Sequence, residues 1–291
     1  MRIQAATEPG DPKRHNEDYA AYTAYTAYTA YAAAALPAPG WGGALVVLDG
    51  VTGPMGPDGC RHGVAWFAGR LGGALLELAG SRRESSLEDC LAEAISRTAD
   101  AHRDTCDLSH PRTPQATAAL ARWDQERVEY LVLCDSVLLL DEAGPAGEGA
   151  PGGGERAGGR VRAVLDTRLG DLRPAARRLP RGERAAFVEG LRNAPGGFWT
   201  AAADPSVARR AVTGSLARGR VRGLAALTDG LGRWVETFGI GDWPDLYALL
   251  AERGPDAAID EVRAAEAADP LGAAFPRAKT HDDASVVIAE L

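Results

Sequence analysis

Acidic residues at the ends of short apolar runs constrain this fold more than any other feature of the sequence. These carboxylates are Glu17 and Asp18 near the start, Asp49, Asp135 and Asp229 directly after apolar runs, and Asp282 and Asp283 before the last run. A carboxylate at the end of a buried strand lies at the rim of a core, where its charge is costly unless a cation meets it. Several carboxylates at one rim repel each other, and their oxygen ligands suit Mg²⁺ or Mn²⁺ better than Zn²⁺. The sequence therefore predicts a divalent-cation site at one end of a sheet.

Composition excludes several classes of protein. Among the 291 residues, 45% are hydrophobic and 25% are charged, as in ordinary globular proteins. The net charge of −8 argues against nucleic-acid binding, which needs a basic face. No apolar stretch approaches the ~20 residues of a membrane span, and the first residues lack the apolar segment of a secretory signal. We therefore expect a cytoplasmic monomer that binds neither nucleic acid nor membrane.

Hydrophobic periodicity and turn residues predict the order of the helices and strands. The predicted helices are 61–80, 86–103 (with Ser86 as N-cap), 206–216, 243–253 and 255–268. The predicted strands, besides the apolar run 44–48, are 116–122, 127–133, 137–140, 161–165, 198–202, 222–228 and 284–290. Antiparallel sheets covered by helices fit this order best, so we expect an α+β fold. No break is long enough to separate two cores, so we expect a single domain over 1–291.

Three segments have an unusual composition. Residues 19–35 repeat Ala-Tyr-Thr, which predicts a strand or hairpin arm with some local disorder. Residues 142–159 are rich in Gly and Pro and predict a flexible hairpin loop. Residues 168–193 carry many arginines among helix formers, which indicates either a solvated helical face or a basic, flap-like insert that faces the substrate.

The four cysteines give no sign of a metal site at this level. Cys60, Cys90, Cys106 and Cys134 show no Cys-x-x-Cys spacing and no histidine at zinc-finger distance. We expect free and mostly buried thiols. His102 likewise has no evident partner.

The acidic motifs, taken together and in order, resemble those of the metal-dependent protein phosphatases of type 2C. The resemblance covers about residues 10–291 and rests on five short motifs. They are Asn16-Glu17-Asp18, Asp49-Gly50 after a strand, Asp135-Ser136, Thr228-Asp229-Gly230, and Asp282-Asp283-Ala284-Ser285 before the last strand. Each motif is weak alone, but five in the family's order are specific together.

The resemblance implies a four-layer α/β/β/α sandwich, two antiparallel sheets flanked by helix pairs, with a two-metal site at one end. It implies that Glu17, Asp49 and the carbonyl of Gly50 bind one Mg²⁺ or Mn²⁺, and that Asp49, Asp229 and Asp282 bind the other. Asp18 would hold water molecules around the metals, and Asp135 lies where some members bind a third ion. The implied reaction is hydrolysis of a phosphomonoester by a water that the two metals activate, with Asp49 and Asp229 as central catalytic residues.

The sequence departs from the family pattern mainly on the substrate side. An arginine that grips phosphate is usual three residues before Asn16, where this chain has Lys13 followed by Arg14. Lysine supplies charge but lacks the bidentate fork of arginine, so either residue is a candidate for the phosphate grip. Cys134 replaces the glycine that usually precedes Asp135.

Three functions follow from this pattern. The first is a protein serine/threonine phosphatase whose partner is a phosphorylated protein. The second is a phosphatase for a small phosphomonoester metabolite, which the divergent insert favours. The third is a catalytically weak binding or sensor module, against which the intact set of acidic residues argues.

Overall fold

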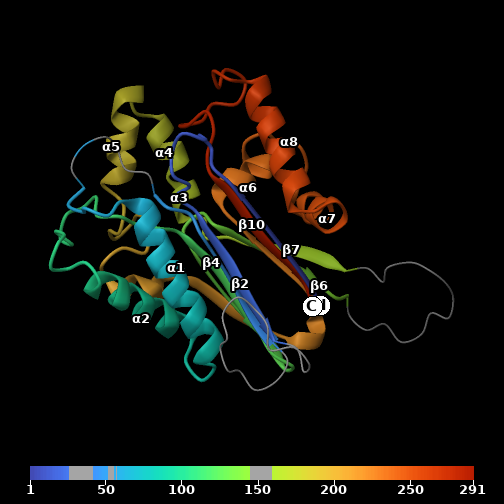
Figure 1. The fold of residues 1–291 in the computed structure, drawn as a ribbon. Coiled ribbons are helices and arrows are strands. Elements are labelled where there is room, and N and C mark those ends of the chain that lie inside the picture. The colour runs from blue at the N-terminus through green and yellow to red at the C-terminus, as the bar shows by residue number, and fades with distance from the viewer. Residues whose placement is uncertain (26–41, 52–55, 57, 145–158) are drawn as a thin grey trace.

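The computed structural model describes residues 1–25, 42–51, 56, 58–144 and 159–291. Two five-stranded antiparallel sheets lie face to face, in the orders β1-β10-β9-β6-β7 and β2-β3-β4-β5-β8. Helices α1 and α2 cover one outer face, α6, α7 and α8 cover the other, and α3, α4 and α5 lie at one end of the sheets (Figure 1). The expected α+β sandwich of two antiparallel sheets is confirmed.

The strands of the first sheet are β1 (Arg2–Glu8), β10 (Ala284–Glu290), β9 (Val221–Leu227), β6 (Val137–Glu142) and β7 (Arg160–Val164). Those of the second are β2 (Tyr19–Tyr25), β3 (Gly42–Leu48), β4 (Ala118–Trp123), β5 (Arg127–Leu133) and β8 (Val212–Ala217).

The longer helices are α1 (Val64–Ser81), α2 (Leu87–Asp100), α6 (Asp229–Glu236), α7 (Trp243–Arg253) and α8 (Pro255–Ala268). Shorter turns are α3 (Arg168–Asp171), α4 (Arg173–Arg177), α5 (Arg184–Glu189), and the 3₁₀ turns η1 (Arg181–Glu183), η2 (Pro205–Arg210) and η3 (Arg218–Arg220). None of the helices in the described part of the chain is long and apolar enough to cross a membrane.

The apolar runs are continuous because the central strands are buried on both faces. Along β3, Val46 and Leu48 pack under α1 and α2, whereas Leu45 and Val47 face the other sheet. A third apolar cluster fills the space between the first sheet and α6, α7 and α8. Four layers thus enclose three hydrophobic interfaces, and polar groups gather where the strands end.

Several predicted elements agree closely with the structure. Strand β5, helices α7 and α8 and strand β10 have the predicted bounds. Ser86 caps α2, since its side chain accepts a hydrogen bond from the amide of Asp89. The arginine-rich segment forms α3, α4, η1 and α5, in line with a helical insert.

The predicted helix over 206–216 is wrong. Pro205 opens the short turn η2, and residues from Val212 onward form β8, the strand at the edge of the second sheet. Residues of β8 alternate between half-buried and exposed, and the strand pairs with β5 in the register Tyr130↔Gly214. Pairing with the free edge of β5 outweighs the modest helix propensity of the segment.

Other predictions missed elements that depend on tertiary partners. Residues 198–202 form two isolated bridges, Arg192↔Phe198 and Ala116↔Ala201, and no strand. Strand β1 and helix α6 were not expected. In the Ala-Tyr-Thr tract the first seven residues are β2, as expected, and the rest of the tract lies outside the described residues. The same holds for 145–158 of the expected flexible loop.

Candidate metal and phosphate site

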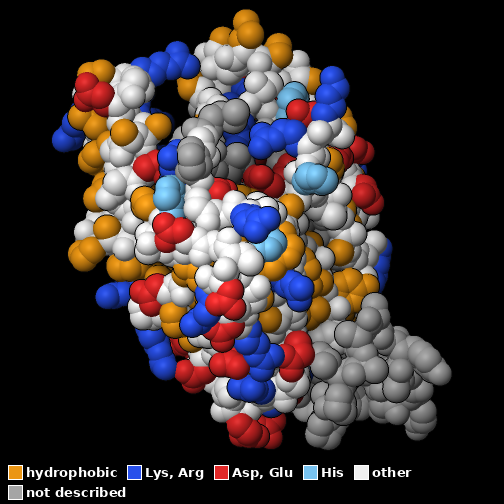
Figure 2. Space-filling view, turned by 60° about the vertical axis from the view of Figure 1, so that its left-hand side comes forward, with side chains coloured by type: hydrophobic (Ala, Val, Ile, Leu, Met, Phe, Trp, Pro, Cys, Tyr) orange, Lys and Arg blue, Asp and Glu red, His pale blue; other side chains and the backbone are white. Residues whose placement is uncertain are grey.

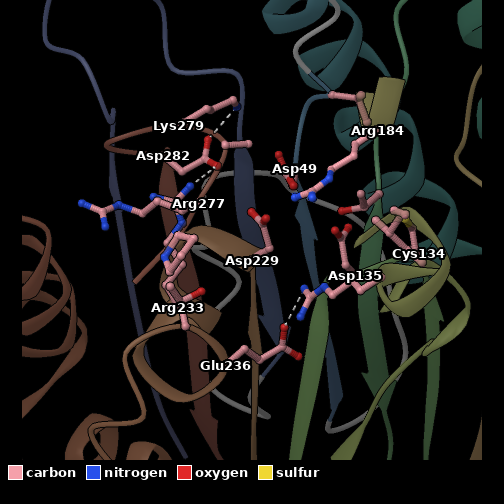
Figure 3. Close-up of a pocket in the computed structure, with 18 of the residues that line it drawn as sticks. Asp49, Cys134, Asp135, Arg184, Asp229, Arg233, Glu236, Arg277, Lys279 and Asp282 are labelled. Atoms are coloured by element: carbon pink, nitrogen blue, oxygen red, sulfur yellow. Dashed lines mark hydrogen bonds and ion pairs between the residues drawn. The ribbon is translucent and has the colours of Figure 1, made fainter. Parts of the chain in front are cut away.

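A cavity of about 650 Å³ opens at the end of the sheets where α3, α4 and α5 lie. Its lining includes Asp49, Asp135, Asp229 and Asp282. Figure 2 shows a hollow in the upper part of the molecule, with acidic side chains deep inside it and basic side chains around it. In Figure 3 the carboxylates of Asp49, Asp135 and Asp229 lie near one another at the centre of this cavity. The structure therefore brings together residues that lie more than two hundred positions apart.

Glycines allow the acidic loops to approach each other closely. A Cβ atom on Gly50 would lie 2.3 Å from the backbone oxygen of Glu17, and one on Gly230 would lie 1.9 Å from that of Asp283. Real Cβ atoms do not come so close, so both positions require glycine. The contacts explain why glycine follows Asp49 and Asp229 in the sequence.

Hydrogen bonds hold the N-terminal acidic segment against the start of β10. Asp283 accepts bonds from the backbone amides of Gly10 (2.8 Å) and Glu17 (2.7 Å). The Thr228 hydroxyl donates to the Asp18 carboxylate at 3.0 Å and accepts from the amide of Ser285 at 3.0 Å. Asp283 is therefore a positioning residue, and Asp18 is fixed at the base of the site.

Burial, and after it the repulsion between neighbouring carboxylates, raises the pKa values of the acidic groups at the site. Burial, opposed in part by the Ser285 hydroxyl and reinforced by Asp283, raises the pKa of Asp18 from 3.8 to about 7. Burial, followed by repulsion from Asp229, raises the pKa of Asp49 well above its usual value. Burial and then the charge of Asp135 do the same to the pKa of Asp229. Bound cations would favour the ionised form of such a cluster.

Two observations indicate that the residues fit divalent cations. One buried oxygen each of Asp18 and Asp135 has no hydrogen-bond partner among the described residues. The donors are all oxygens, as Mg²⁺ and Mn²⁺ prefer. The carboxylate of Asp282 differs from these, because two cationic side chains already hold it, Arg233 at 2.7 Å and Lys279 at 2.7 Å (Figure 3).

Basic side chains form the wall of the cavity that faces the carboxylates. They are Arg173, Arg177, Arg184, Arg192, Arg233, Arg277 and Lys279. Several have acidic partners, for example Arg173 with Glu236 (3.3 Å) and Arg277 with Asp269 (3.0 Å). Within the described part of the chain, Arg177 and Arg184 have no ion pair with a carboxylate.

Arg184 is the most prominent of these basic groups. In Figure 3 it points into the cavity from the side opposite Arg233 and Asp282. Its guanidinium donates to the backbone oxygens of Leu179 (3.0 Å) and Arg177 (3.2 Å), and no carboxylate among the described residues forms an ion pair with it. The arginine-rich composition of the insert signalled this wall, but not which arginines reach the cavity.

The two N-terminal candidates for the phosphate grip lie away from this cavity. Arg14 lines a separate hollow of about 40 Å³ together with Glu17 and Asp282, and its guanidinium is 4.0 Å from Glu17. Lys13 is exposed and is not among the lining residues of either cavity, and its backbone amide donates to Asp11. Glu17 lines the small hollow and is not among the residues that line the large cavity, although its backbone lies close to Gly50, which does line it.

Cys134 occupies a backbone position that glycine would adopt more easily. Its φ of 65° lies in the left-handed region, which explains the expected glycine before Asp135. The amide of Cys134 donates to Asp166 at 2.9 Å, and Arg168 in turn binds that carboxylate at 2.6 Å. Asp166 and Arg168, which sequence reasoning passed over, thus hold the turn that carries Asp135.

Comparisons with known proteins were made by sequence and by structure. No protein-family model matches the chain, and no curated protein matches it by sequence. Among solved structures it resembles the serine/threonine phosphatase Stp1 from Staphylococcus aureus, with a TM-score of 0.59, 12% identity, and coverage of 100% of this chain and 95% of that one. It also resembles the serine-threonine phosphatase 2C from Toxoplasma gondii, with a TM-score of 0.54, 10% identity, and coverage of 98% and 93%.

A third similar structure contains metal ions. The catalytic domain of the serine/threonine protein phosphatase PstP, in complex with two manganese ions, matches with a TM-score of 0.50, 15% identity, and coverage of 99% of this chain and 97% of that one. These matches span the whole chain. The chain therefore has the fold of the type 2C serine/threonine protein phosphatases.

Proposed function

We propose that this protein is a Mg²⁺- or Mn²⁺-dependent phosphomonoester hydrolase that acts on phosphoserine or phosphothreonine in proteins. The observation that carries the proposal is the meeting of Asp49, Asp229 and Asp282 in a cavity whose opposite wall is lined with arginines. Carboxylates suit the metals, and arginines suit the phosphate oxygens. The fold, shared with serine/threonine phosphatases, supports the same assignment.

The metal ligands we propose are those that the resemblance to the type 2C phosphatases implies. Glu17, Asp49 and the carbonyl of Gly50 would hold one ion, and Asp49, Asp229 and Asp282 would hold the other. Two such ions, when bound, lower the pKa of a water between them and neutralise phosphoryl oxygens. Asp18 would orient water through its free oxygen, and Asp135 would serve a third ion.

The chain's own residues supply binding and orientation. Arg184 and Arg177 lie in the cavity wall without carboxylate partners among the described residues, so their charge is available for an incoming phosphate. Arg233 and Lys279 keep the Asp282 carboxylate turned toward the cavity. Thr228 and Asp283 fix the acidic loops before any substrate binds, which reduces the ordering needed during reaction.

A small phosphomonoester metabolite is the alternative substrate. The cavity volume of about 650 Å³ is within the range of small-molecule sites, which keeps this alternative open.

Hydrolysis of para-nitrophenyl phosphate with and without Mn²⁺ tests the enzyme activity, and we expect turnover only with the metal. A phosphopeptide panel beside a metabolite panel separates the two substrates. Lack of Mn²⁺-dependent turnover on all of them would instead support a binding module.

Matched substitutions can identify the residue that binds the phosphate group of the substrate. We expect Arg184→Ala to raise KM about tenfold, since a charge-assisted hydrogen bond is worth roughly 1.5–3 kcal/mol, with metal affinity little changed. Arg181→Ala, which removes an exposed arginine of the same insert, is the control and should leave KM unchanged. Steady-state kinetics at saturating Mn²⁺ give the answer. A rise in KM for Lys13→Ala or Arg14→Ala, with Arg184→Ala unaffected, would place the grip on the N-terminal segment instead.

A further inference from the structure

Two cysteines and two histidines meet away from the acidic cavity. One potential ligand atom from each of Cys60, His62, His102 and Cys106 lies within 4.8 Å of all the others. The four are absent from the lining of the acidic cavity. The finding corrects the expectation that these cysteines have no histidine partners. A Cys-x-His pair is followed forty residues later by a His-x₃-Cys pair, and the two pairs meet only in the folded chain.

The separations between these atoms match those of a tetrahedral zinc site. The Cys60 sulfur lies 3.4 Å from that of Cys106 and 3.6 Å from Nδ1 of His102. Nδ1 of His62 lies 3.7 Å from the sulfur of Cys60 and 3.4 Å from that of Cys106. With Zn–S near 2.3 Å and Zn–N near 2.0 Å, tetrahedral geometry places the ligand atoms roughly 3.3–3.8 Å apart, so the observed separations need to change by only a few tenths of an ångström.

Local structure holds both pairs in place. His102 and Cys106 lie one helical turn apart just after α2, where the amide of Cys106 donates to the carbonyl of His102 at 3.0 Å. Cys60 and His62 lie in the loop before α1. Backbone amides point at both sulfurs, from His62 to Cys60 (3.4 Å) and from Arg61 to Cys106 (3.4 Å). Such donors stabilise thiolates, the form of cysteine that binds metal.

Aromatic residues enclose the cluster on one side. The ring of His62 stacks on Trp66 at a centroid distance of 4.2 Å, and His102 lies 5.1 Å from the same indole. His102 itself is buried, with 3% of its surface exposed. A buried imidazole beside two sulfurs is well placed as a ligand and poorly placed as a solvated surface group.

We propose that Cys60, His62, His102 and Cys106 bind a structural Zn²⁺ ion. Four protein ligands complete the tetrahedron, so the ion would be structural and would leave no position open for substrate. Each thiol would release one proton to solvent on binding. Sulfur and imidazole donors distinguish this site from the all-oxygen cavity, where Mg²⁺ or Mn²⁺ is preferred.

The ion would join two segments that support the acidic cavity. The amide of Asp107 donates to the carbonyl of Gly59 at 2.8 Å, so the loop before α1 already touches the segment after α2. That segment continues to Gln115, whose carbonyl accepts from the amide of Val51, and to Thr117, whose amide donates to the carbonyl of Asp49. Zinc at the cluster would therefore brace the backbone on either side of Asp49.

Metal analysis of the purified full chain tests the proposal. After brief chelation to remove weakly held Mg²⁺ or Mn²⁺, we expect about one zinc per chain, as a closed four-ligand site implies. Cobalt substitution should give the absorption of a tetrahedral thiolate complex. Cys60→Ser and Cys106→Ser should each lose the zinc and the cobalt spectrum. Cys90→Ala and His110→Ala remove a cysteine and a histidine outside the cluster and should keep both.

Three outcomes would overturn the zinc assignment. The first is wild-type protein without zinc that also takes up none when zinc is added under reducing conditions. The second is a Cys60–Cys106 disulfide found by mass spectrometry in protein purified with reductant. The third is full zinc content in both serine variants. Because zinc content is measured apart from turnover, the result does not depend on the phosphatase activity.

Discussion

Asp49→Asn should lower the turnover number by about 10²-fold or more, the order lost when one preorganised electrostatic contact is removed. In the proposed site Asp49 would serve both metal ions, so removing its charge would weaken both ion sites at once. The same substitution should raise the melting temperature of the metal-free protein, because burial and the charges of Asp229, Asp18, Asp135 and Asp282 make the Asp49 carboxylate costly there. Loss of function with gain of stability is the expected signature.

Kinetics with para-nitrophenyl phosphate and thermal unfolding without metal measure both effects. Asp260→Asn, which removes an exposed carboxylate on α8, is the control and should change neither. Residual activity above about a tenth of wild type would contradict the bridging role of Asp49, since the charge of a bridging ligand cannot be lost at so small a cost. Asp229→Asn and Asp282→Asn should also abolish turnover.

The stability of the metal-free protein should fall as the pH rises from about 4 to about 7. Asp18 has a pKa of about 7 in the folded chain and an ordinary value of 3.8. Between these values the folded state binds more protons than the unfolded state, so the free energy of unfolding decreases with pH. The raised pKa values of Asp49 and Asp229 act in the same direction. We expect a drop of about 5 °C or more in melting temperature across this range.

Added Mn²⁺ should restore the melting temperature that is lost as the pH rises. Its effect should be larger at the upper end of the pH range, because the carboxylates there carry charge that, without the metal, has no cationic partner among the described residues. Differential scanning fluorimetry with and without Mn²⁺ makes the measurement. Asp18→Asn should flatten the metal-free profile. A metal-free melting temperature that rises over this range would show that the acidic cluster does not control stability.

Many helices and strands could be predicted from the sequence because their local residue patterns agree with the way they pack in the folded chain. The capping pair of Ser86 and Asp89 and the single apolar faces of α7 and α8 carry their structural information within a few residues. Strand β8 does not, because residues 212–217 form a strand only through pairing with β5. Helix α6 was missed because Asp229-Gly230, which opens it, has the form of a turn dipeptide after the predicted strand 222–228.

The sequence pointed to the acidic residues that line the cavity, but not to the arginines of its wall. Asp49, Asp135 and Asp229 each directly follow an apolar run, which marks their places at strand ends. Arg184 carries no such mark, since its role depends on how the insert folds over the sheet ends. The Cys60–Cys106 cluster was missed because its pairs lie in a loop and a helical turn that only the packing of α1 on α2 brings together.

The position of β10 affects the order in which the chain can fold. This strand lies between β1 and β9, yet it is the last of the described strands to leave the ribosome. Until it arrives, β1 has no partner in its sheet, β9 keeps an open edge, and Asp283 cannot anchor the segment that carries Glu17. Contacts of such long sequence separation form slowly. A nascent chain would therefore build its second sheet with α1 and α2 first, and would complete the acidic cavity only in the final step of folding.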